Sequence, residues 1–386
     1  MLLCARVVLA EEYKPVRAGG FMLTPKLMIE QVYTDNVYAS VDKESDHISM
    51  IKPSLLIEKS YRDHEFELET GGEARRYWSN SDESVINFKT EFRGTVTARR
   101  VLMLPFKMSY ESGHFDRREE RGELTREPTG FKLLKTEIGA DYAPSRLGLG
   151  FYAGYSQSRF ENGETFSGVS VVNEDGDYDS LYARMVARYK TKADWTPFAS
   201  LQLGRNDFLR RTHDGTGFNG PERDNHVIRA LAGAEYDDHK IWKGSAAIGH
   251  EWRKYDGGGI EDIGALSAES KIDWMPSRKL KLSFDFLRRT EEDSTADNGI
   301  VETDAGLSFN YELRHNLFLQ GGAEWERAQF DAADRTDDTY GGRIGLLWAL
   351  NSRLEAGASY LHRYRESSAA SDFDENIFLL RLTGKL

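Results

Sequence analysis

Apolar and polar residues alternate along most of this chain, in segments of about ten residues that are separated by turn-forming residues. One apolar row consists of Leu134, Thr136, Ile138, Ala140 and Tyr142, and the positions between them hold Lys135, Glu137, Gly139 and Asp141. A period of two is typical of β-strands that have one apolar face. Further rows of this kind begin at Leu181, Ile228, Leu266, Leu280, Thr303, Leu317, Gly342, Leu354 and Phe378. The pattern therefore predicts an all-β chain.

Aromatic residues gather at the ends of these rows. They include Tyr142, Tyr189, Tyr236, Trp242, Trp274, Tyr311, Trp325 and Trp348. A membrane–water interface favours this placement, because the ring enters the acyl region while its polar edge stays hydrated. A soluble sandwich gives no reason for it, so we expect the apolar rows to face lipid.

The connections between the rows alternate in length. One set is short, at 61–64, 143–146, 237–240, 275–278, 314–316 and 351–353. The other set is longer and rich in Asp, Gly and Ser, at 116–130, 161–176, 211–224, 290–299 and 331–338. Short periplasmic turns at one end and longer extracellular loops at the other are typical of outer-membrane barrels.

Counting strands from Phe21 gives about eighteen, and an even number puts both termini at the short-turn end. Hydrocarbon excludes an open sheet edge, because its backbone groups would have no hydrogen-bond partners. We therefore expect residues 21–386 to form a single transmembrane antiparallel β-barrel in the outer membrane. The mean hydropathy of −0.58, taken alone, argues against a membrane protein. It does not exclude a transmembrane barrel, because only every second strand residue meets lipid. A soluble propeller or solenoid is the alternative, but the chain shows no repeated blade motif.

Residues 1–20 are expected to be a leader or a disordered N-terminal segment. The stretch Met1–Ala10 is apolar and ends in a small residue, as a signal peptide does. It contains Cys4, the single cysteine of the chain. Removal of the leader would leave no cysteine, which suits an oxidising compartment.

No enzyme motif stands out in this chain. The histidines are scattered and show no Ser/His spacing of the kind that a hydrolase needs. The net charge of −12 argues against a nucleic-acid partner. Two Asp-rich stretches, 175–179 and 334–338, offer carboxylates to Ca²⁺, although such runs are more often solvated loop tips. We expect a protein that is not an enzyme and holds no cofactor or metal.

If the apolar rows face lipid, the polar positions between them face the interior. Eighteen strands enclose an aqueous lumen rather than a packed core. The residues expected to line this lumen are Glu65, Glu67, Glu69, Glu73, Tyr77, Glu91, Tyr152, Tyr182, Arg184, Arg188, Arg229, Arg253, Glu269, Lys271, Glu324 and Arg343. Opposed charges would create a transverse field that filters polar solutes, and tyrosine faces would stack on sugar rings. Alternatively, the charges only brace the barrel wall through ion pairs.

Short motifs near both ends resemble those of a known family. They are Tyr33-Thr34-Asp35-Asn36-Val37-Tyr38, Ser45-Asp46-His47-Ile48, Arg363-Tyr364-Arg365-Glu366-Ser367-Ser368 and Ser371-Asp372-Phe373-Asp374-Glu375-Asn376. From Phe21 onward the chain resembles the outer-membrane β-barrel porins found with exopolysaccharide biosynthesis operons. The resemblance implies passage of a secreted polysaccharide across the outer membrane, beside a periplasmic polysaccharide-export protein. One departure is the ending Gly384-Lys385-Leu386, which lacks the final aromatic residue of many outer-membrane barrels.

Three functions therefore remain open. The first is an exopolysaccharide export channel, which rests mainly on the resemblance. The second is a general diffusion porin for small polar solutes, which rests on the number of strands. The third is a structural or adhesive surface barrel whose long loops bind a partner. Outer-membrane lipid is an expected partner in all three, and the sequence leaves the oligomeric state open.

Overall fold

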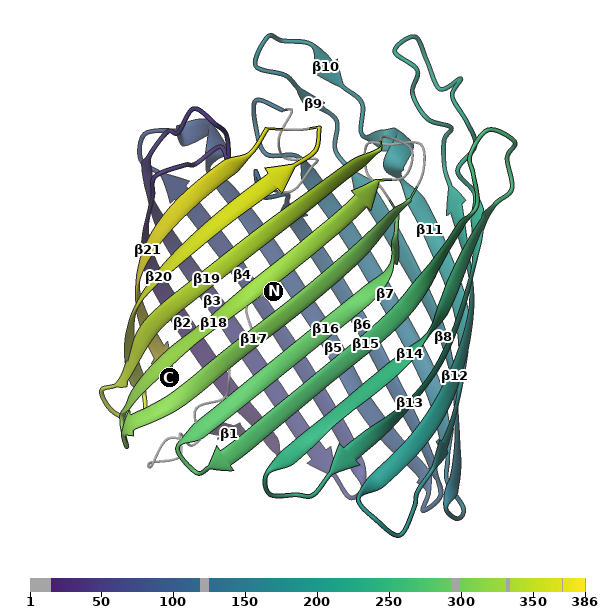
Figure 1. Cartoon of the computed structure of the whole chain (residues 1–386). Coiled ribbons are helices and arrows are strands. Elements are labelled where there is room, and N and C mark those ends of the chain that lie inside the picture. The colour runs from purple at the N-terminus through teal and green to yellow at the C-terminus, as the bar shows by residue number, and fades with distance from the viewer. Residues whose placement is uncertain (1–14, 119–124, 293–298, 331–333, 370, 386) are drawn as a thin grey trace.

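The chain forms one closed β-barrel of eighteen antiparallel strands, counted over the residues that the computed structural model describes, which are 15–118, 125–292, 299–330, 334–369 and 371–385 (Figure 1). The barrel strands are β2 (Phe21–Thr34), β3 (Asp46–Tyr61), β4 (His64–Tyr77), β5 (Val85–Arg99), β6 (Leu102–His114), β7 (Gly130–Tyr142), β8 (Leu147–Phe160), β11 (Tyr178–Tyr189), β12 (Trp195–Phe208), β13 (Asn225–Asp237), β14 (Trp242–Tyr255), β15 (Ile263–Ser277), β16 (Leu280–Glu291), β17 (Ile300–Arg314), β18 (Leu317–Phe330), β19 (Arg335–Ala349), β20 (Leu354–Ser367) and β21 (Phe373–Lys385). In the described part of the chain, no helix is long and apolar enough to cross a membrane. The prediction of an all-β barrel of about eighteen strands is confirmed.

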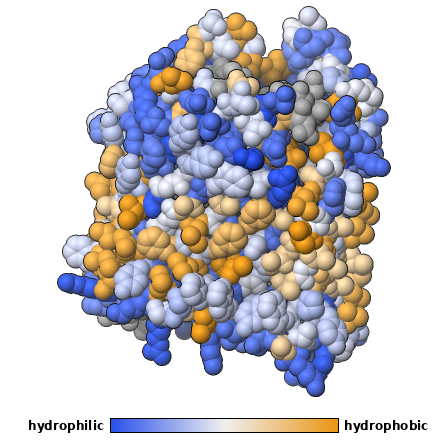
Figure 2. Space-filling view, in the orientation of Figure 1, coloured by the Kyte–Doolittle hydropathy of each residue, from blue (hydrophilic) through white to orange (hydrophobic). Residues whose placement is uncertain are grey.

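The two-residue period of the sequence becomes the two faces of the barrel wall. Ile138, Leu181 and Leu380 lie on the outer face and are 62–66% exposed, as expected for side chains that meet lipid. Directly opposite residues of neighbouring antiparallel strands share a face, so the register carries this assignment from strand to strand. Figure 2 shows the result as an apolar band across the wall, with hydrophilic residues above and below it.

The barrel closes between its first and last strands. β2 pairs with β21 from Lys26 opposite Lys385 to Thr34 opposite Ile377, and with β3 on its other edge. Beyond the end of β21, the short strand β1 (Val16–Ala18) pairs with Phe21–Leu23 of β2. This edge of β2 is thus paired at Phe21–Leu23 and from Lys26 to Thr34, which satisfies backbone groups that hydrocarbon cannot hydrate.

The two ends of the barrel differ in their connections. The eight turns that join β3/β4, β5/β6, β7/β8, β11/β12, β13/β14, β15/β16, β17/β18 and β19/β20 are short, and all lie at the lower end in Figure 1. Four of them, including the turn from Tyr61 to His64, leave two residues between the strand ends, and Arg62 has a positive φ of 55°. Every short turn carries a basic residue within it or directly beside it: Arg62, Arg99, Arg100, Arg146, Lys190, Lys192, Lys240, Arg278, Lys279, Arg314 and Arg353.

Most of the connections at the other end are longer and hold small elements of their own. The β4/β5 loop contains the 3₁₀ helix η1 (Ser81–Glu83). The β8/β11 loop contains the hairpin β9 (Gly163–Glu164) and β10 (Ser170–Val171), followed by the 3₁₀ helix η3 (Glu174–Gly176). These loops rise above the barrel in Figure 1. The alternation of short and long connections is as the sequence indicates, with one exception.

The exception is the stretch 331–338, which the sequence predicts to be a long loop. The structure begins β19 at Arg335, so Thr336, Asp337 and Asp338 continue the ladder with β18. The acidic residues are tolerated there because Arg335 binds Asp337 and Arg327 binds Asp338 at 2.8 Å. The prediction of a long loop is therefore wrong: ion pairs keep a polar stretch in β-structure above the apolar band.

The predicted leader, residues 1–20, falls mostly outside the described residues, which begin at position 15. Within that segment, Val16–Ala18 is paired to the barrel as β1. The paired structure therefore begins five positions before Phe21, where the sequence places the start of the barrel.

Candidate functional site

The register places the residues predicted to line the lumen on one face of the wall, opposite the apolar rows. Glu67 pairs with Arg93 across β4/β5, Tyr152 pairs with Arg184 across β8/β11, and Arg229 pairs with Glu251 across β13/β14. The same face holds Glu65, Glu67, Glu69, Glu73, Tyr77, Glu91, Tyr152, Tyr182, Arg184, Arg188, Arg229, Arg253, Glu269, Lys271, Glu324 and Arg343. That these side chains act on a solute remains a prediction.

The acidic residues of the early strands are bridged by cations that the sequence analysis does not single out. Arg93 binds both Glu67 and Glu91, with 2.8 Å to Glu91, and Lys107 binds Glu91 at 3.0 Å. Lys52 lies between Glu73, at 2.7 Å, and Glu30, at 2.8 Å. Glu65 and Glu69 form no ion pair among the described residues.

The basic residues of the later strands are paired in the same way. Arg184 binds Glu137 at 2.9 Å, Arg188 lies between Asp141 at 3.7 Å and Glu235 at 3.4 Å, and Arg229 lies between Glu251 at 3.5 Å and Glu269 at 3.1 Å. Of the remaining predicted residues, Glu324 binds Arg363 at 3.1 Å and Lys271 reaches Asp285 at 4.0 Å. The lumenal charges of the early and of the later strands are thus largely neutralised by ion pairs with neighbouring side chains. These ion pairs favour bracing of the barrel wall over a strong transverse field.

Tyr182 lies flat against the inner wall because glycine occupies the position across from it. A Cβ atom placed on Gly154 would come within 2.3 Å of the Tyr182 ring, so the ring lies over a residue that has no side chain. The Tyr182 hydroxyl donates to Glu137, the same carboxylate that binds Arg184. The side chain therefore lies along the wall, across Gly154 toward β7, and it is half-buried.

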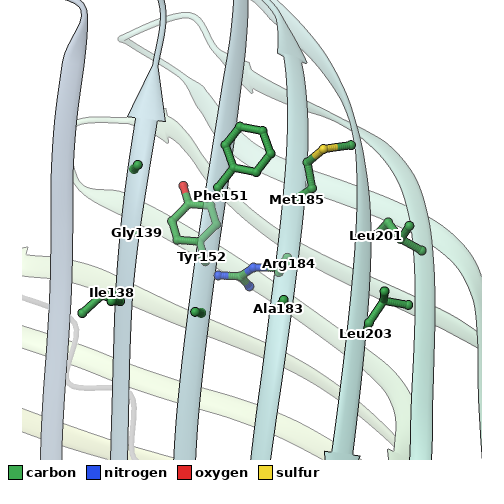
Figure 3. Close-up of a pocket in the computed structure, with 11 residues that line it drawn as sticks. Ile138, Gly139, Phe151, Tyr152, Ala183, Arg184, Met185, Leu201 and Leu203 are labelled. Atoms are coloured by element: carbon green, nitrogen blue, oxygen red, sulfur yellow. The ribbon is translucent and has the colours of Figure 1, made fainter.

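Tyr152 also lies over glycine residues, but a cation lies over its ring. Its ring lies over Gly139 and Gly150, and its hydroxyl donates to Asp141. The guanidinium group of Arg184 lies 4.7 Å from the Tyr152 ring centroid, as Figure 3 shows for these two side chains on adjacent strands. The face of Tyr152 is thus occupied by a cation, and Tyr182 is the better candidate for contact with a solute.

A lumenal cavity of about 580 Å³ adjoins Tyr182. Its lining combines the tyrosine with hydroxyl, amide and charged groups, including Ser156, Ser180, Gln202, Asn206 and Arg229, and with apolar side chains such as Phe131 and Leu133. A flat ring beside many hydrogen-bond donors and acceptors suits a polyhydroxylated ligand. The second cavity, of about 470 Å³, lies on the opposite side of the same wall, where Ile138, Phe151, Met185, Leu201 and Leu203 give it an apolar lining (Figure 3).

The start of the β6/β7 loop contacts the inner wall, which sequence reasoning did not find. Arg118 donates from Nε to Glu375 on β21 at 2.6 Å and also binds Asp116. The neighbouring Arg117 donates to Glu83 of η1 at 2.8 Å. Glu375 is fully buried and also accepts from Thr34 at 2.7 Å. Alternation along the chain indicates the face of Glu375, but no local pattern indicates that a loop five strands away binds it.

The ionisation of these loop groups follows from burial and ion pairing. Burial alone would raise the pKa of Asp116, but Arg118 and Arg75 outweigh it and hold the pKa of Asp116 below its ordinary value. Burial would lower the pKa of Arg118, but Asp116 and Glu375 raise it instead. The charged pair is therefore the favoured state, and it fixes the loop to the wall.

Acidic groups that could hold a cation occur on β17 and β18. One carboxylate oxygen each from Glu302, Asp304 and Glu326 lies within 4.8 Å of the others. The Asp-rich stretches in which the sequence allows Ca²⁺ are engaged in protein contacts instead. Asp177 accepts from the backbone of Phe160 at 2.7 Å, and Asp179 binds Arg159 at 2.6 Å.

A family model described as "Putative beta-barrel porin 2" matches residues 12–386. The chain belongs to this family. Family membership and the eighteen-strand barrel together place this porin in the outer membrane, with a channel-like fold. No curated protein matches the chain.

Several solved barrels resemble this porin at low sequence identity. The copper transporter OprC is 11% identical, with 97% of this chain and 81% of that chain covered and a TM-score of 0.49. OpdO of Pseudomonas aeruginosa is 12% identical, with 94% and 97% covered and a TM-score of 0.47. The ferric citrate transporter FecA is 11% identical, with 91% and 61% covered and a TM-score of 0.46.

Proposed function

We propose that this porin is a non-enzymatic channel through which a polysaccharide crosses the outer membrane. The observation that carries the proposal is the Tyr182 ring, which lies over Gly154 beside a lumenal cavity of mixed polar and apolar lining. Sugar rings present C–H groups that pack on the face of an aromatic ring, while their hydroxyls need hydrogen-bond partners. Ser180 and Gln202, which line the same cavity, offer such partners.

The paired charges of the lumen also support a sugar polymer as the solute. Carboxylates and guanidinium groups that bind one another leave the wall polar without a large excess of either sign. Such a wall hydrogen-bonds a neutral chain without holding it tightly, which a moving polymer requires. A periplasmic polysaccharide-export protein at the short-turn end is part of this proposal.

The test is secretion by cells that lack the gene. We expect extracellular polysaccharide to be lost on deletion and restored by the wild-type gene. The Tyr182→Ala variant should restore it poorly, because losing an aromatic contact weakens sugar binding about 2- to 10-fold. Tyr155→Ala is the matched control, because Tyr155 lies on the outer face of β8 and its hydroxyl binds Asp179 rather than a lumenal group.

Heat-modifiable migration on gels would show that each variant forms a barrel. If deletion left the extracellular polysaccharide unchanged while uptake of small polar solutes fell, the protein would be a diffusion porin and the proposal would be wrong. If both were unchanged, a structural or adhesive role would replace it.

A further inference from the structure

The short-turn end of the barrel carries a concentration of unpaired positive charge. We name as the basic rim the lysines and arginines of the eight short turns given above. Among the described residues, none of these side chains forms an ion pair with a carboxylate. Arginines of the long loops behave differently: Arg126 binds Asp82, Arg210 binds Glu174 and Arg211 binds Glu222. The basic rim is therefore available for another anion.

Acidic residues within or directly beside the same turns do not neutralise the rim. They are Asp63, Asp194, Asp237 and Asp238, against eleven basic residues. Asp237 binds Lys243, which lies outside the rim, at 3.4 Å. The Asp238 carboxylate accepts hydrogen bonds from the backbone N–H groups of Lys240, Ile241 and Trp242, at 2.8–2.9 Å. It therefore stabilises the turn. The charge excess at this end contrasts with the net charge of −12 for the whole chain.

The basic rim lies directly beyond a belt of exposed aromatic residues. Exposed rings at Tyr142, Tyr189, Trp242, Trp274, Tyr311 and Trp348 precede or follow the turns that hold Arg146, Lys190, Lys240, Arg278, Arg314 and Arg353. Each ring is separated from its basic neighbour by at most five positions. Aromatic belts mark the depth of the membrane interface, so cations next to them lie at the level of the lipid phosphates. In Figure 2 the hydrophilic lower edge adjoins the apolar band.

We propose that the basic rim binds the phosphate groups of anionic phospholipids in the leaflet at the short-turn end. An acidic polymer entering the lumen is the competing partner for the same cations. The inner face at this end disfavours it, because Glu58, Glu65 and Glu69 lie there without an ion pair among the described residues. A polyanion guided to the mouth by the rim would meet these carboxylates, whereas a lipid phosphate outside the barrel would not.

The test measures which of two lipids lies beside a pair of tryptophans next to the basic rim. Trp242 and Trp274 stack with ring centroids 5.1 Å apart, next to the turns that hold Lys240, Arg278 and Lys279. The full-length porin is reconstituted in bilayers of phosphatidylcholine and phosphatidylglycerol, with either lipid brominated so that it quenches tryptophan fluorescence. We expect brominated phosphatidylglycerol to quench preferentially, with a local preference of about five-fold for each basic residue in contact with a phosphate.

The triple variant Lys240→Gln, Arg278→Gln, Lys279→Gln should bring this preference close to one. The control Arg126→Gln, Arg210→Gln, Arg211→Gln changes the net charge equally at exposed long-loop positions and should retain the wild-type preference. The single variant Lys240→Gln should show a partial loss, which keeps the test usable if the triple variant does not insert.

An unchanged phosphatidylglycerol preference in the rim variant would overturn the proposal. If in addition the rim variant lost binding of polygalacturonate, a soluble acidic polysaccharide, the rim would serve a polymer instead of lipid. Binding of lipid by the basic rim does not identify the transported solute. The proposed function is therefore tested separately, by the secretion experiment.

Discussion

At the scale of single residues, glycine decides where a lumenal ring can lie. Gly154 provides the space in which Tyr182 lies flat against β8, and the Tyr182 hydroxyl then reaches Glu137. The sequence alternation predicts the face of Tyr182 but not this contact, because alternation gives each residue a side of the wall and not a neighbour. The cross-strand register supplies the neighbour, and only the structure gives that register.

A side chain at position 154 should destabilise the folded barrel. Gly154→Val would place a Cβ atom within 2.3 Å of the ring, so the ring must leave the wall and lose its bond to Glu137. We expect destabilisation of about 1–3 kcal/mol, measured by chemical unfolding in detergent. Gly306→Ala is the control on β17, where an added Cβ meets nothing within 4 Å, and should change stability by about 0.5 kcal/mol or less. Equal losses in both variants would contradict the packing account.

Asp116 makes the anchored loop sensitive to acid. Its pKa is held below the ordinary value of 3.8, so the folded protein favours the ionised carboxylate. The stabilisation is complete above that ordinary value and is lost as pH falls through the lowered pKa. The thermal midpoint in detergent should therefore drop as the pH falls below the ordinary carboxyl range, and should drop less in Asp116→Asn. If the thermal midpoints of the wild type and of Asp116→Asn depended on pH in the same way, Asp116 would not be the group that makes the loop sensitive to acid.

At the scale of elements, each strand has one wet and one apolar face. On β11, Tyr182 and Arg184 face the lumen, while Leu181 and Met185 lie on the outer face and are 62% and 45% exposed. Both faces of β11 can be read from the sequence, because its residues alternate without interruption. The start of β19 cannot, because its acidic residues resemble a loop until the ion pairs with Arg335 and Arg327 are known.

Single cysteines should report these two faces in a Cys4→Ser background. A charged, water-soluble maleimide should label Tyr182→Cys in the reconstituted porin and should leave Leu181→Cys unlabelled, because only the lumenal position meets water. Labelling is read by mass spectrometry after confirming that both variants form barrels. If Leu181→Cys were labelled as fast as Tyr182→Cys, the assignment of the faces would be reversed or the wall would be open.

The β6/β7 loop depends on one buried ion pair with β21. Arg118→Met would leave Glu375, which is fully buried, with only the hydrogen bond from Thr34. Loss of one member of a buried ion pair costs about 3–5 kcal/mol, measured as above by unfolding in detergent. Adding Glu375→Gln to Arg118→Met should recover part of that loss, because the remaining side chain carries no charge. A double variant no better than Arg118→Met would show that the two residues do not interact.

At the scale of the whole molecule, the sequence indicates the barrel well and its interior contacts poorly. Row periodicity and loop lengths predict the closed ring of strands because both are local properties of the chain. The contact of Arg118 with Glu375 joins positions 257 apart, and that of Glu30 with Arg381 joins positions 351 apart. Such contacts follow from closure and strand tilt, which no short segment encodes. The membrane-facing wall follows from the two-residue period, and the two unlike ends of the barrel follow from the loop lengths.

The central claim is that the polar face encloses water that connects the two sides of the membrane. Purified full-length protein added to a planar lipid bilayer tests it most directly. We expect stepwise single-channel currents that rise linearly with salt concentration. Current that never exceeds the leak of the empty bilayer, from protein shown to be folded by heat-modifiable migration, would contradict the account.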